Sequence, residues 1–253
     1  MAPTAEKVSS EPQEADAWVK VRPRRGRRLA DKTSAKTSSR AFTPKEPTIS
    51  LEQVKQDHGR FSSEWTSSPA HAQLQELLSS HMASTSSRVT KAICFGLGTF
   101  DPTTYHWKHC SHIQLAAFLG IVKHLQSIAN SQIRCIFQEP LFNSVDKAFI
   151  TDLGHEVVES PVGFQLVDSE TMTFGIHLYR NVCSQIVATC IPAIYIGTSY
   201  EAWTEAPGDS FRIDDLVRLK ELDQLSTSVE FPDNNFDHIF APATIHWRQE
   251  EQT

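Results

Sequence analysis

Two groups of chemically capable residues follow one another closely between Ile93 and Ala116. The first is the pair Gly96 and Gly98, which forms a G-x-G turn directly after the apolar run KAICF. Glycines at such a turn let the backbone approach a phosphate group or a cofactor closely. The second group contains four side chains of the kinds that bind zinc. Its members are His106, His109, Cys110 and His112.

The glycine pair lacks the third glycine of a dinucleotide-binding fingerprint. That position, where helix and strand pack closely, holds Asp101 and is followed by Pro102. A G-x-G turn also fits the first loop of an S-adenosylmethionine site, in which an acid after the second strand holds the ribose hydroxyls. Glu139 has that place, but about forty residues downstream, where a dinucleotide site has its acid after about twenty. The turn therefore either reverses the chain or holds a nucleotide-like ligand, and no cofactor is assigned.

The histidine and cysteine group does not predict a metal centre. A closed zinc site needs its ligands to converge on one point, whereas a helix that begins near Ser111 turns His112 away from Cys110. Histidines beside a helix start are commonly exposed, or hydrogen-bonded to free backbone groups. We expect this here and assign no metal ligand.

Two further histidines, His177 and His246, follow or lie in apolar runs that predict strands. Either could act as a general acid or base, and either could equally close the end of a strand. The sequence contains no nucleophile elbow, no phosphate loop of the G-x-x-x-x-G-K type and no paired-acid signature beside them. No catalytic residue is therefore assigned.

The surrounding sequence predicts the elements that must position these residues. Apolar runs predict strands at 91–98, 133–140, 155–160 and 191–197. Amphipathic stretches predict helices at 50–65, 69–82, 111–129, 143–154, 178–190 and 211–225. Residues 163–177 resemble two short strands joined by a turn at 168–170, and residues 236–247 contain one late strand.

The strands are apolar throughout instead of alternating, so both of their faces need cover. This pattern predicts a three-layer α/β domain with a mainly parallel, Rossmann-like sheet and helices on both faces. The ends of parallel strands share one edge of the sheet, where crevices form, so we predict one pocket there. Its predicted members are Gly96, Gly98, Thr99, Phe100, Glu139, His177, Gly197, Thr198, Ser199 and His246.

A basic segment precedes this acidic body. Residues 18–40 contain nine Lys or Arg and one Asp, a local charge of +8. Since the formal net charge of the chain is −6, the remaining residues carry a net charge of −14. The segment is too polar to fold alone, so we predict a disordered arm at 1–47, a helical lead-in packed on the domain at 48–88, and the α/β domain at 89–249. The run RPRRGRR suits nuclear import or contact with nucleic-acid phosphates, or simply keeps the chain soluble. Its arginines are Arg22, Arg24, Arg25, Arg27 and Arg28.

The composition indicates a globular protein of a reducing compartment. The five cysteines form an odd set without a C-x-x-C pair, and Cys94, Cys135 and Cys190 lie in apolar runs. The first residues lack the apolar core of a secretory signal. Residues 181–200 carry no formal charge, but Pro192 and several polar side chains favour a buried helix and strand over a membrane span. We expect a protein of the cytoplasm and nucleus.

Several short motifs, in the right order, resemble the Sensitivity to Red Light Reduced family, the SRR-like domain. They run from about Lys91 to Trp247 and comprise FGLGTF, QLA, QEPLFNSVD followed by LG, a histidine at His177, LYRNV, IGTSY and TIHW. As in family members, a tryptophan, Trp18, and a basic run precede the domain. The chain departs from the family as a divergent, fungal-type sequence would. The family's Asp-Pro, Pro-His-Cys and Asn-Ser are here Glu139-Pro140, Ile176-His177-Leu178 and Thr198-Ser199.

The resemblance implies a regulatory protein of light signalling and the circadian clock, with no established reaction. We therefore expect a non-enzymatic regulator that binds a protein partner or a small polar ligand, with nucleic acid contacted only through the basic arm and no membrane involved. The alternative is a nucleotide- or S-adenosylmethionine-using transferase with Gly96-Leu97-Gly98 as its cofactor loop. The sequence does not name the ligand, the partner, the regulated process or the oligomeric state.

Overall fold

The computed structural model describes residues 44–82, 88–102, 104–205, 213–233, 236 and 238–249. Residues 41–253 make one compact unit. The five arginines of the basic arm lie outside the described residues. None of the helices in the described part of the chain is both long and apolar enough to cross a bilayer.

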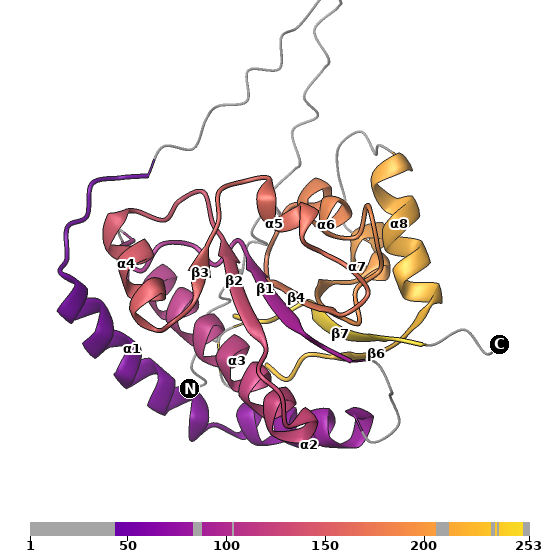
Figure 1. The fold of residues 1–253 in the computed structure, drawn as a ribbon, viewed down its shortest axis with the longest axis horizontal. Coiled ribbons are helices and arrows are strands. Elements are labelled where there is room, and N and C mark those ends of the chain that lie inside the picture. The colour runs from indigo at the N-terminus through magenta and orange to yellow at the C-terminus, as the bar shows by residue number, and fades with distance from the viewer. Residues whose placement is uncertain are drawn as a thin grey trace, which may run out of the picture. The chain divides into compact units, whose positions relative to one another are not determined.

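A seven-stranded sheet forms the centre of this unit, in the order β3-β2-β1-β4-β5-β7-β6 (Figure 1). The strands are β1 (Lys91–Phe95), β2 (Arg134–Gln138), β3 (Glu156–Val157), β4 (Thr171–Gly175), β5 (Ile194–Thr198), β6 (Ser226–Glu230) and β7 (Ala243–Arg248). The first five run parallel, while β7 pairs antiparallel with both β5 and β6. The predicted mainly parallel α/β sheet is thereby confirmed.

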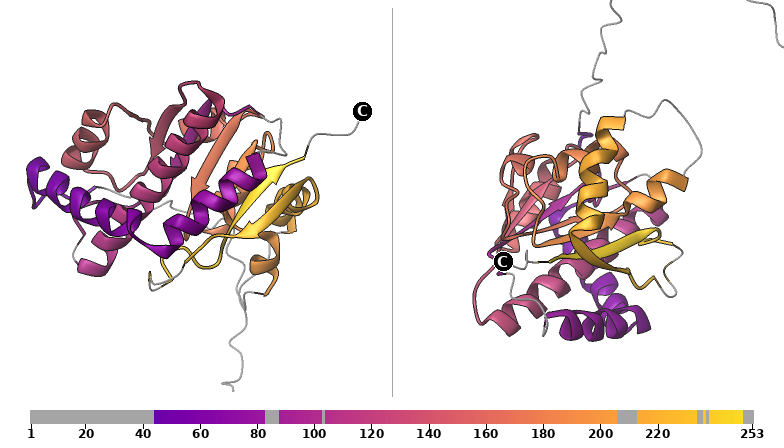
Figure 2. Two further views of the ribbon diagram at one scale, coloured as in Figure 1. Left: turned by 90° about the horizontal axis from the view of Figure 1, so that it is seen from below. Right: turned by 90° about the vertical axis from the view of Figure 1, so that its right-hand side faces the viewer.

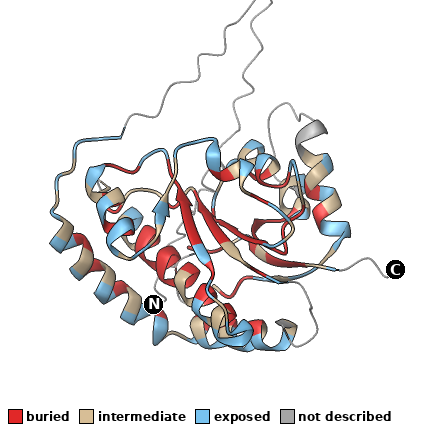
Figure 3. Ribbon diagram, viewed as in Figure 1, coloured by how far each residue is buried: buried red, intermediate tan, exposed pale blue. Residues whose placement is uncertain are grey.

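Helices cover both faces of the sheet, as the views in Figure 2 show. One face packs against α1 (Leu51–Thr66), α2 (Pro69–Met82), α3 (Tyr105–Ala129) and α4 (Ser144–Asp152). The other packs against α5 (Val162–Gln165), α6 (Arg180–Ile186), α7 (Tyr200–Glu205) and α8 (Ile213–Gln224). Because side chains alternate along a strand, Cys94 joins the first core while its neighbours Ile93 and Phe95 join the second. This double burial explains the uninterrupted apolar strands (Figure 3).

The long helix α3 begins where the loop after β1 ends. The Thr104 side chain caps its N-terminus by accepting from the Trp107 N–H, and Asn130 ends it in the left-handed conformation. Every residue from Cys110 to Phe118 is buried, because the sheet lies on one side of the helix and α1 on another. The sequence predicted an amphipathic helix here, with one apolar face of Leu115, Phe118, Leu119, Val122 and Leu125, but the buried surface is wider than that face.

Two other local predictions were wrong, and two elements were missed. The first of the two strands expected within 163–177 is the short helix α5, which follows Pro161. The strand expected at 155–160 contains only two residues of β3. Strand β6, with the polar sequence STSVE, was missed because it is an edge strand with mostly exposed side chains, and the short helix α7 was missed as well.

Candidate functional site

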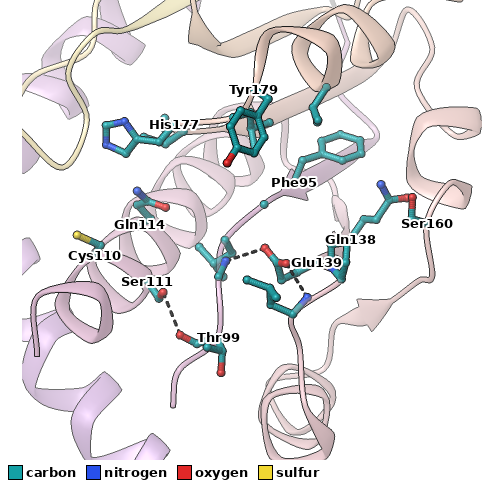
Figure 4. A pocket seen from close by; sticks show the side chains of 18 of the residues that line it. Phe95, Thr99, Cys110, Ser111, Gln114, Gln138, Glu139, Ser160, His177 and Tyr179 are labelled. Carbon is teal, nitrogen blue, oxygen red and sulfur yellow. Dashed lines mark hydrogen bonds between the residues drawn. The ribbon is translucent and has the colours of Figure 1, made fainter. Parts of the chain in front are cut away.

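A cavity of about 620 Å³ opens at the carboxyl ends of β1, β2 and β4. The chain leaves β1 toward β2 and β3 on one side of the sheet and returns to β4 and β5 on the other, so the cavity lies at the switch point of strand order. Doubly wound sheets bind their ligands at this place. The first turns of α3, the chain before α5 and the helix α6 complete its walls (Figure 4).

The loop after β1 forms the floor of the cavity with two glycines in the left-handed region. Gly96 has φ +67° and Gly98 has φ +78°. The Leu178 side chain occupies the space that a Cβ would need at Gly96 and also at Gly175, at the end of β4. Glycine at position 96 therefore suits both the backbone conformation and the contact with Leu178, whose side chain would have to move for any other residue.

Glu139 follows β2 and holds this loop from the cavity side. Its carboxylate accepts the Gly98 N–H at 2.8 Å with one oxygen and the Leu141 N–H at 2.7 Å with the other (Figure 4). Burial raises the pKa of this carboxyl, and the two backbone hydrogen bonds oppose the shift. The acid that the sequence placed at the end of the second strand thus lies beside the glycine loop and bonds to it directly.

A second acid, Asp146, holds the same loop from below. Its carboxylate accepts from the Thr99 hydroxyl at 2.7 Å and from the Phe100 N–H at 3.1 Å. Asp146 is fully buried and also forms the capping box of α4 with Asn143. Burial raises its pKa, against the effect of these hydrogen bonds. Sequence reasoning missed Asp146, although its position three residues after a helix-capping Asn143 was the available signal.

Two buried glutamines present polar groups to the cavity. The Gln138 Oε1 accepts the Gly163 N–H at 2.7 Å, which leaves its NH₂ group as a donor on the cavity wall. The Gln114 NH₂ group donates to the Ile239 carbonyl at 3.4 Å, which leaves its Oε1 as an acceptor. Both side chains are at least 95% buried. The cavity therefore offers one oriented donor and one oriented acceptor.

Aromatic rings contribute much of the remaining wall. Phe95 and Phe164 stack with a centroid distance of 5.1 Å and an interplanar angle of 6°. Trp107 and Tyr179 also line the cavity, yet 58% of Trp107 and 75% of Tyr179 is exposed to solvent. Exposed large aromatic side chains at the rim of a cavity are typical of binding sites.

His177 lies on the cavity wall, two residues after the end of β4, and Figure 4 shows it on the same side as Tyr179. Its backbone has φ +55°, an uncommon conformation for a residue other than glycine. Of the predicted pocket residues, the structure brings five to this cavity. They are Gly96, Gly98, Thr99, Glu139 and His177.

Phe100, predicted at the pocket, does not line the cavity. It points into the core, where its ring contacts His112 at 4.9 Å and Phe149 at 5.1 Å. The loop turns over at this point because the Phe100 N–H is bonded to the buried Asp146.

Gly197, Thr198 and Ser199 also do not line the cavity, because β5 lies one strand beyond the switch point. A Cβ at Gly197 would lie 2.7 Å from the Tyr195 hydroxyl, so this glycine serves packing. Ser199 accepts the Ala202 N–H within the first turn of α7.

His246 was predicted at the same edge as the other residues, and this prediction was wrong because β7 runs antiparallel. Its ring lies within hydrogen-bonding distance of the Thr244 and Ser226 hydroxyls, at 2.7 and 3.0 Å. Only 1% of the residue is exposed, and burial lowers its pKa to about 4. His246 is thus a core histidine of the sheet.

The histidine and cysteine group disperses. His109 bonds to Glu64 at 2.8 Å, and the Cys110 sulfur lies 3.7 Å from the His106 ring. His112 was expected to be exposed or bonded to the backbone, but it is fully buried among aromatic rings. Within the ranges that the structure describes, no three His, Cys, Asp or Glu side chains are grouped so that they could hold a metal ion.

Comparison with known proteins identifies one family. The family model of the SRR1 domain matches residues 71–247, which include the whole cavity and all of the sheet except the last residue of β7. No curated protein and no solved structure matches the chain. The match covers well over half of the sequence and agrees with the motifs FGLGTF, LYRNV and TIHW. This chain belongs to the SRR1 domain family.

Proposed function

We propose that this protein is a non-enzymatic regulator whose SRR1 domain binds a small ligand in the cavity at the switch point. The observation that carries the proposal is the cavity itself, which has the volume of a drug-sized ligand site and lies where doubly wound sheets bind ligands. Its buried Gln114 and Gln138 add the few oriented polar groups that such sites contain.

The acid of the cavity supports binding over catalysis. Glu139 uses both carboxylate oxygens to hold backbone N–H groups of its own chain, and Asp146 is equally engaged below the loop. A general base needs an oxygen within reach of the substrate's proton, and these oxygens serve the loop. His177 also lines the cavity, and no acid or nucleophile is bonded to its ring among the described residues.

Native mass spectrometry of the protein purified from its own cells tests ligand binding. We expect a small molecule that stays bound to the wild type and to Val217→Trp, a change on the exposed face of α8. The bound molecule should be lost from Val182→Trp, because Val182 lines the cavity and a larger ring fills it. A retained protein in place of a small molecule would show that a partner, not a ligand, is the main target. Equal retention by both variants would refute binding in this cavity.

A second function, that of an S-adenosylmethionine-using transferase, is favoured by a specific observation. The antiparallel β7 lies between β5 and β6, the strand arrangement common among S-adenosylmethionine-dependent methyltransferases, and Glu139 lies beside the glycine loop. Isothermal titration with S-adenosylmethionine and S-adenosylhomocysteine separates the two functions. Submillimolar binding of both, lost in Val182→Trp, would favour the transferase, and no binding at millimolar concentration would remove it.

The basic arm and the family resemblance supply the cellular part of the proposal. We expect the protein in cytoplasm and nucleus, with RPRRGRR acting as the import signal. Replacing Arg24, Arg25, Arg27 and Arg28 with alanine should lower nuclear accumulation without changing the melting temperature. An unchanged distribution would remove the import role. Light signalling and the clock are the processes to examine, by comparing a clock reporter in cells with and without the protein.

A further inference from the structure

The chemistry of the cavity wall restricts the ligand more than its position does. No Lys or Arg is among the described residues that line it. The nearest candidate along α3, Lys108, directs its ammonium group to Asp57 on α1, with an N–O distance of 3.0 Å. Phosphate groups in proteins are held mainly by cationic side chains and by free backbone N–H groups. The described wall therefore offers a phosphate no cationic side chain.

The backbone N–H groups of the glycine loop are also poorly placed to hold a phosphate. In a phosphate-binding loop the N–H groups point at the ligand, whereas here the Gly98 N–H donates to the Glu139 carboxylate at 2.8 Å. The Gly96 N–H donates to the Gln138 carbonyl at 3.2 Å. A phosphate on this loop would have to displace a buried carboxylate and would meet its negative charge. The loop is thus adapted to a group that is neutral or positively charged.

The polar and aromatic groups that remain suit a flat heterocycle. The Gln138 NH₂ group can donate to a ring nitrogen or carbonyl, and the Gln114 Oε1 can accept from an amino or imino group. The Phe95 and Phe164 rings supply aromatic surface inside, and Trp107 and Tyr179 supply it at the rim. Aromatic surface combined with a few fixed amide groups is typical of sites for heteroaromatic compounds.

From these observations we infer that the cavity binds an uncharged or cationic heteroaromatic compound and excludes its phosphorylated form. The inference rests on the proposed ligand-binding function and narrows it to nucleoside-like compounds, as opposed to nucleotides. For the transferase alternative, it favours a sulfonium nucleoside over a nucleoside phosphate.

Matched pairs of compounds that differ only by one phosphate test the inference. Ligand-observed NMR with the full-length protein and millimolar compound can compare three such pairs. The pairs are adenosine and AMP, nicotinamide riboside and its mononucleotide, and riboflavin and FMN. At least one dephosphorylated compound should bind, and its phosphate should bind about tenfold more weakly or not at all. Phosphates that bind as well as their partners would overturn the inference and leave ligand binding intact. If the wild type bound none of the six compounds and native mass spectrometry found no retained molecule, both this inference and the proposed ligand-binding function would be refuted.

Variants assign the binding to the cavity. Tyr179→Ala should weaken the affinity for the compound about 2- to 10-fold, which is the effect of losing one aromatic contact. Tyr105→Ala is the matched control, since Tyr105 is 64% exposed but does not line the cavity. Gln185→Arg places a cation on the exposed part of the wall and should recover binding of the phosphate. Equal effects of the two tyrosine variants on binding would show that the compound does not bind in this cavity. A second result would also contradict the inference. If the wild type bound a phosphorylated compound and Arg180→Gln abolished that binding, Arg180 would be a cation that serves the cavity.

Discussion

Gly98 combines two constraints that can be separated by experiment. Its φ of +78° is unfavourable for other residues, and a Cβ would lie 3.1 Å from the Ser111 hydroxyl oxygen on α3. Gly154 after α4 has a similar φ of +84° with nothing within 4 Å, and Gly59 in α1 has helical backbone and open space. The three glycines form a graded set.

Alanine at these positions should therefore have three different effects on the free energy of unfolding. Gly59→Ala should stabilise by about 0.5–1 kcal/mol, because alanine favours helix. Gly154→Ala should destabilise by about 1 kcal/mol through backbone strain alone. Gly98→Ala should cost more than Gly154→Ala, because Ser111 must also move. Urea unfolding measures all three, and equal costs at Gly98 and Gly154 would show that the α3 contact is unimportant.

The buried His112 and the half-buried His58 make stability depend on pH. His112 is fully buried with both ring nitrogens unpaired among the described residues, and His58 lies 5.7 Å away between ring centroids. Burial lowers the pKa of His112 to about 3 and that of His58 to about 4, and the neighbouring His58 contributes to the shift at His112. Asp57 opposes this shift, while Lys108 and Arg60 add to it. Both rings are therefore neutral in the folded protein at neutral pH.

Stability should fall as the pH drops below about 6.5. The unfolded chain then binds protons at these histidines while the folded protein does not, so acid favours unfolding. Each ring contributes a loss of roughly 2 kcal/mol between pH 6.5 and pH 5. His112→Phe should make the dependence shallower, and the double variant with His58→Phe should make it shallower still. Urea unfolding at several pH values measures this slope, and a slope unchanged in both variants would contradict the burial effect.

At the scale of elements, Asp146 couples the start of α4 to the loop after β1. One carboxylate closes the capping box with the Asn143 N–H at 3.0 Å and also bonds to Thr99 and Phe100. Sheet strands β1 and β2 are neighbours, so this link fixes the two chain segments that leave their carboxyl ends. The loop geometry is therefore maintained by a helix cap outside the cavity.

Asp146→Asn should loosen that link. An amide has one acceptor oxygen where the carboxylate has two, so at least one buried donor loses its partner, at a cost of about 1–3 kcal/mol. Any ligand of the cavity should also bind more weakly, because of the two acids only Glu139 then holds the loop, through the Gly98 N–H. Asp152→Asn is the control, since Asp152 ends α4 in an exposed ion pair with Lys55. Equal stability of the two variants would contradict the coupling.

At the scale of the whole molecule, α1 completes a core that the family match does not include. The match begins at residue 71, within α2, yet Phe61 and Trp65 of α1 are fully buried. Trp65 contacts Phe236 and Phe240 at 5.3 and 5.2 Å, and Phe61 contacts His112 at 5.3 Å. The helix thus covers aromatic surface of the domain that follows it.

A chain that begins at residue 68 should therefore fold poorly, whereas one that begins at residue 44 should keep wild-type stability. Loss of two large buried aromatic side chains costs on the order of 3–5 kcal/mol each, comparable with the total stability of a domain. Circular dichroism with thermal melting compares the two fragments. A cooperative melt of the shorter fragment at the wild-type temperature would show that α1 is an addition and not part of the core.

The sequence by itself determined the local elements and the α/β class. Periodicity and uninterrupted apolar runs report burial along one segment, which is why the helices α1 and α2 and the strands β1, β2 and β5 were predicted close to their observed positions. The helix α3 was predicted to begin near Ser111, but it begins at Tyr105, where the Thr104 side chain caps it. The same patterns placed Gly98 and Glu139 at the ends of the first two strands, and these residues do meet through a hydrogen bond.

Only the tertiary structure decided which strand ends lie together. The direction of β7 removes His246 from the cavity, and the place of β5 beyond the switch point removes Thr198. The same long-range packing brings Gln114, Gln138 and Tyr179 to one cavity and buries His112. Strand order and direction depend on pairings between segments far apart in the chain, and local periodicity carries no record of them.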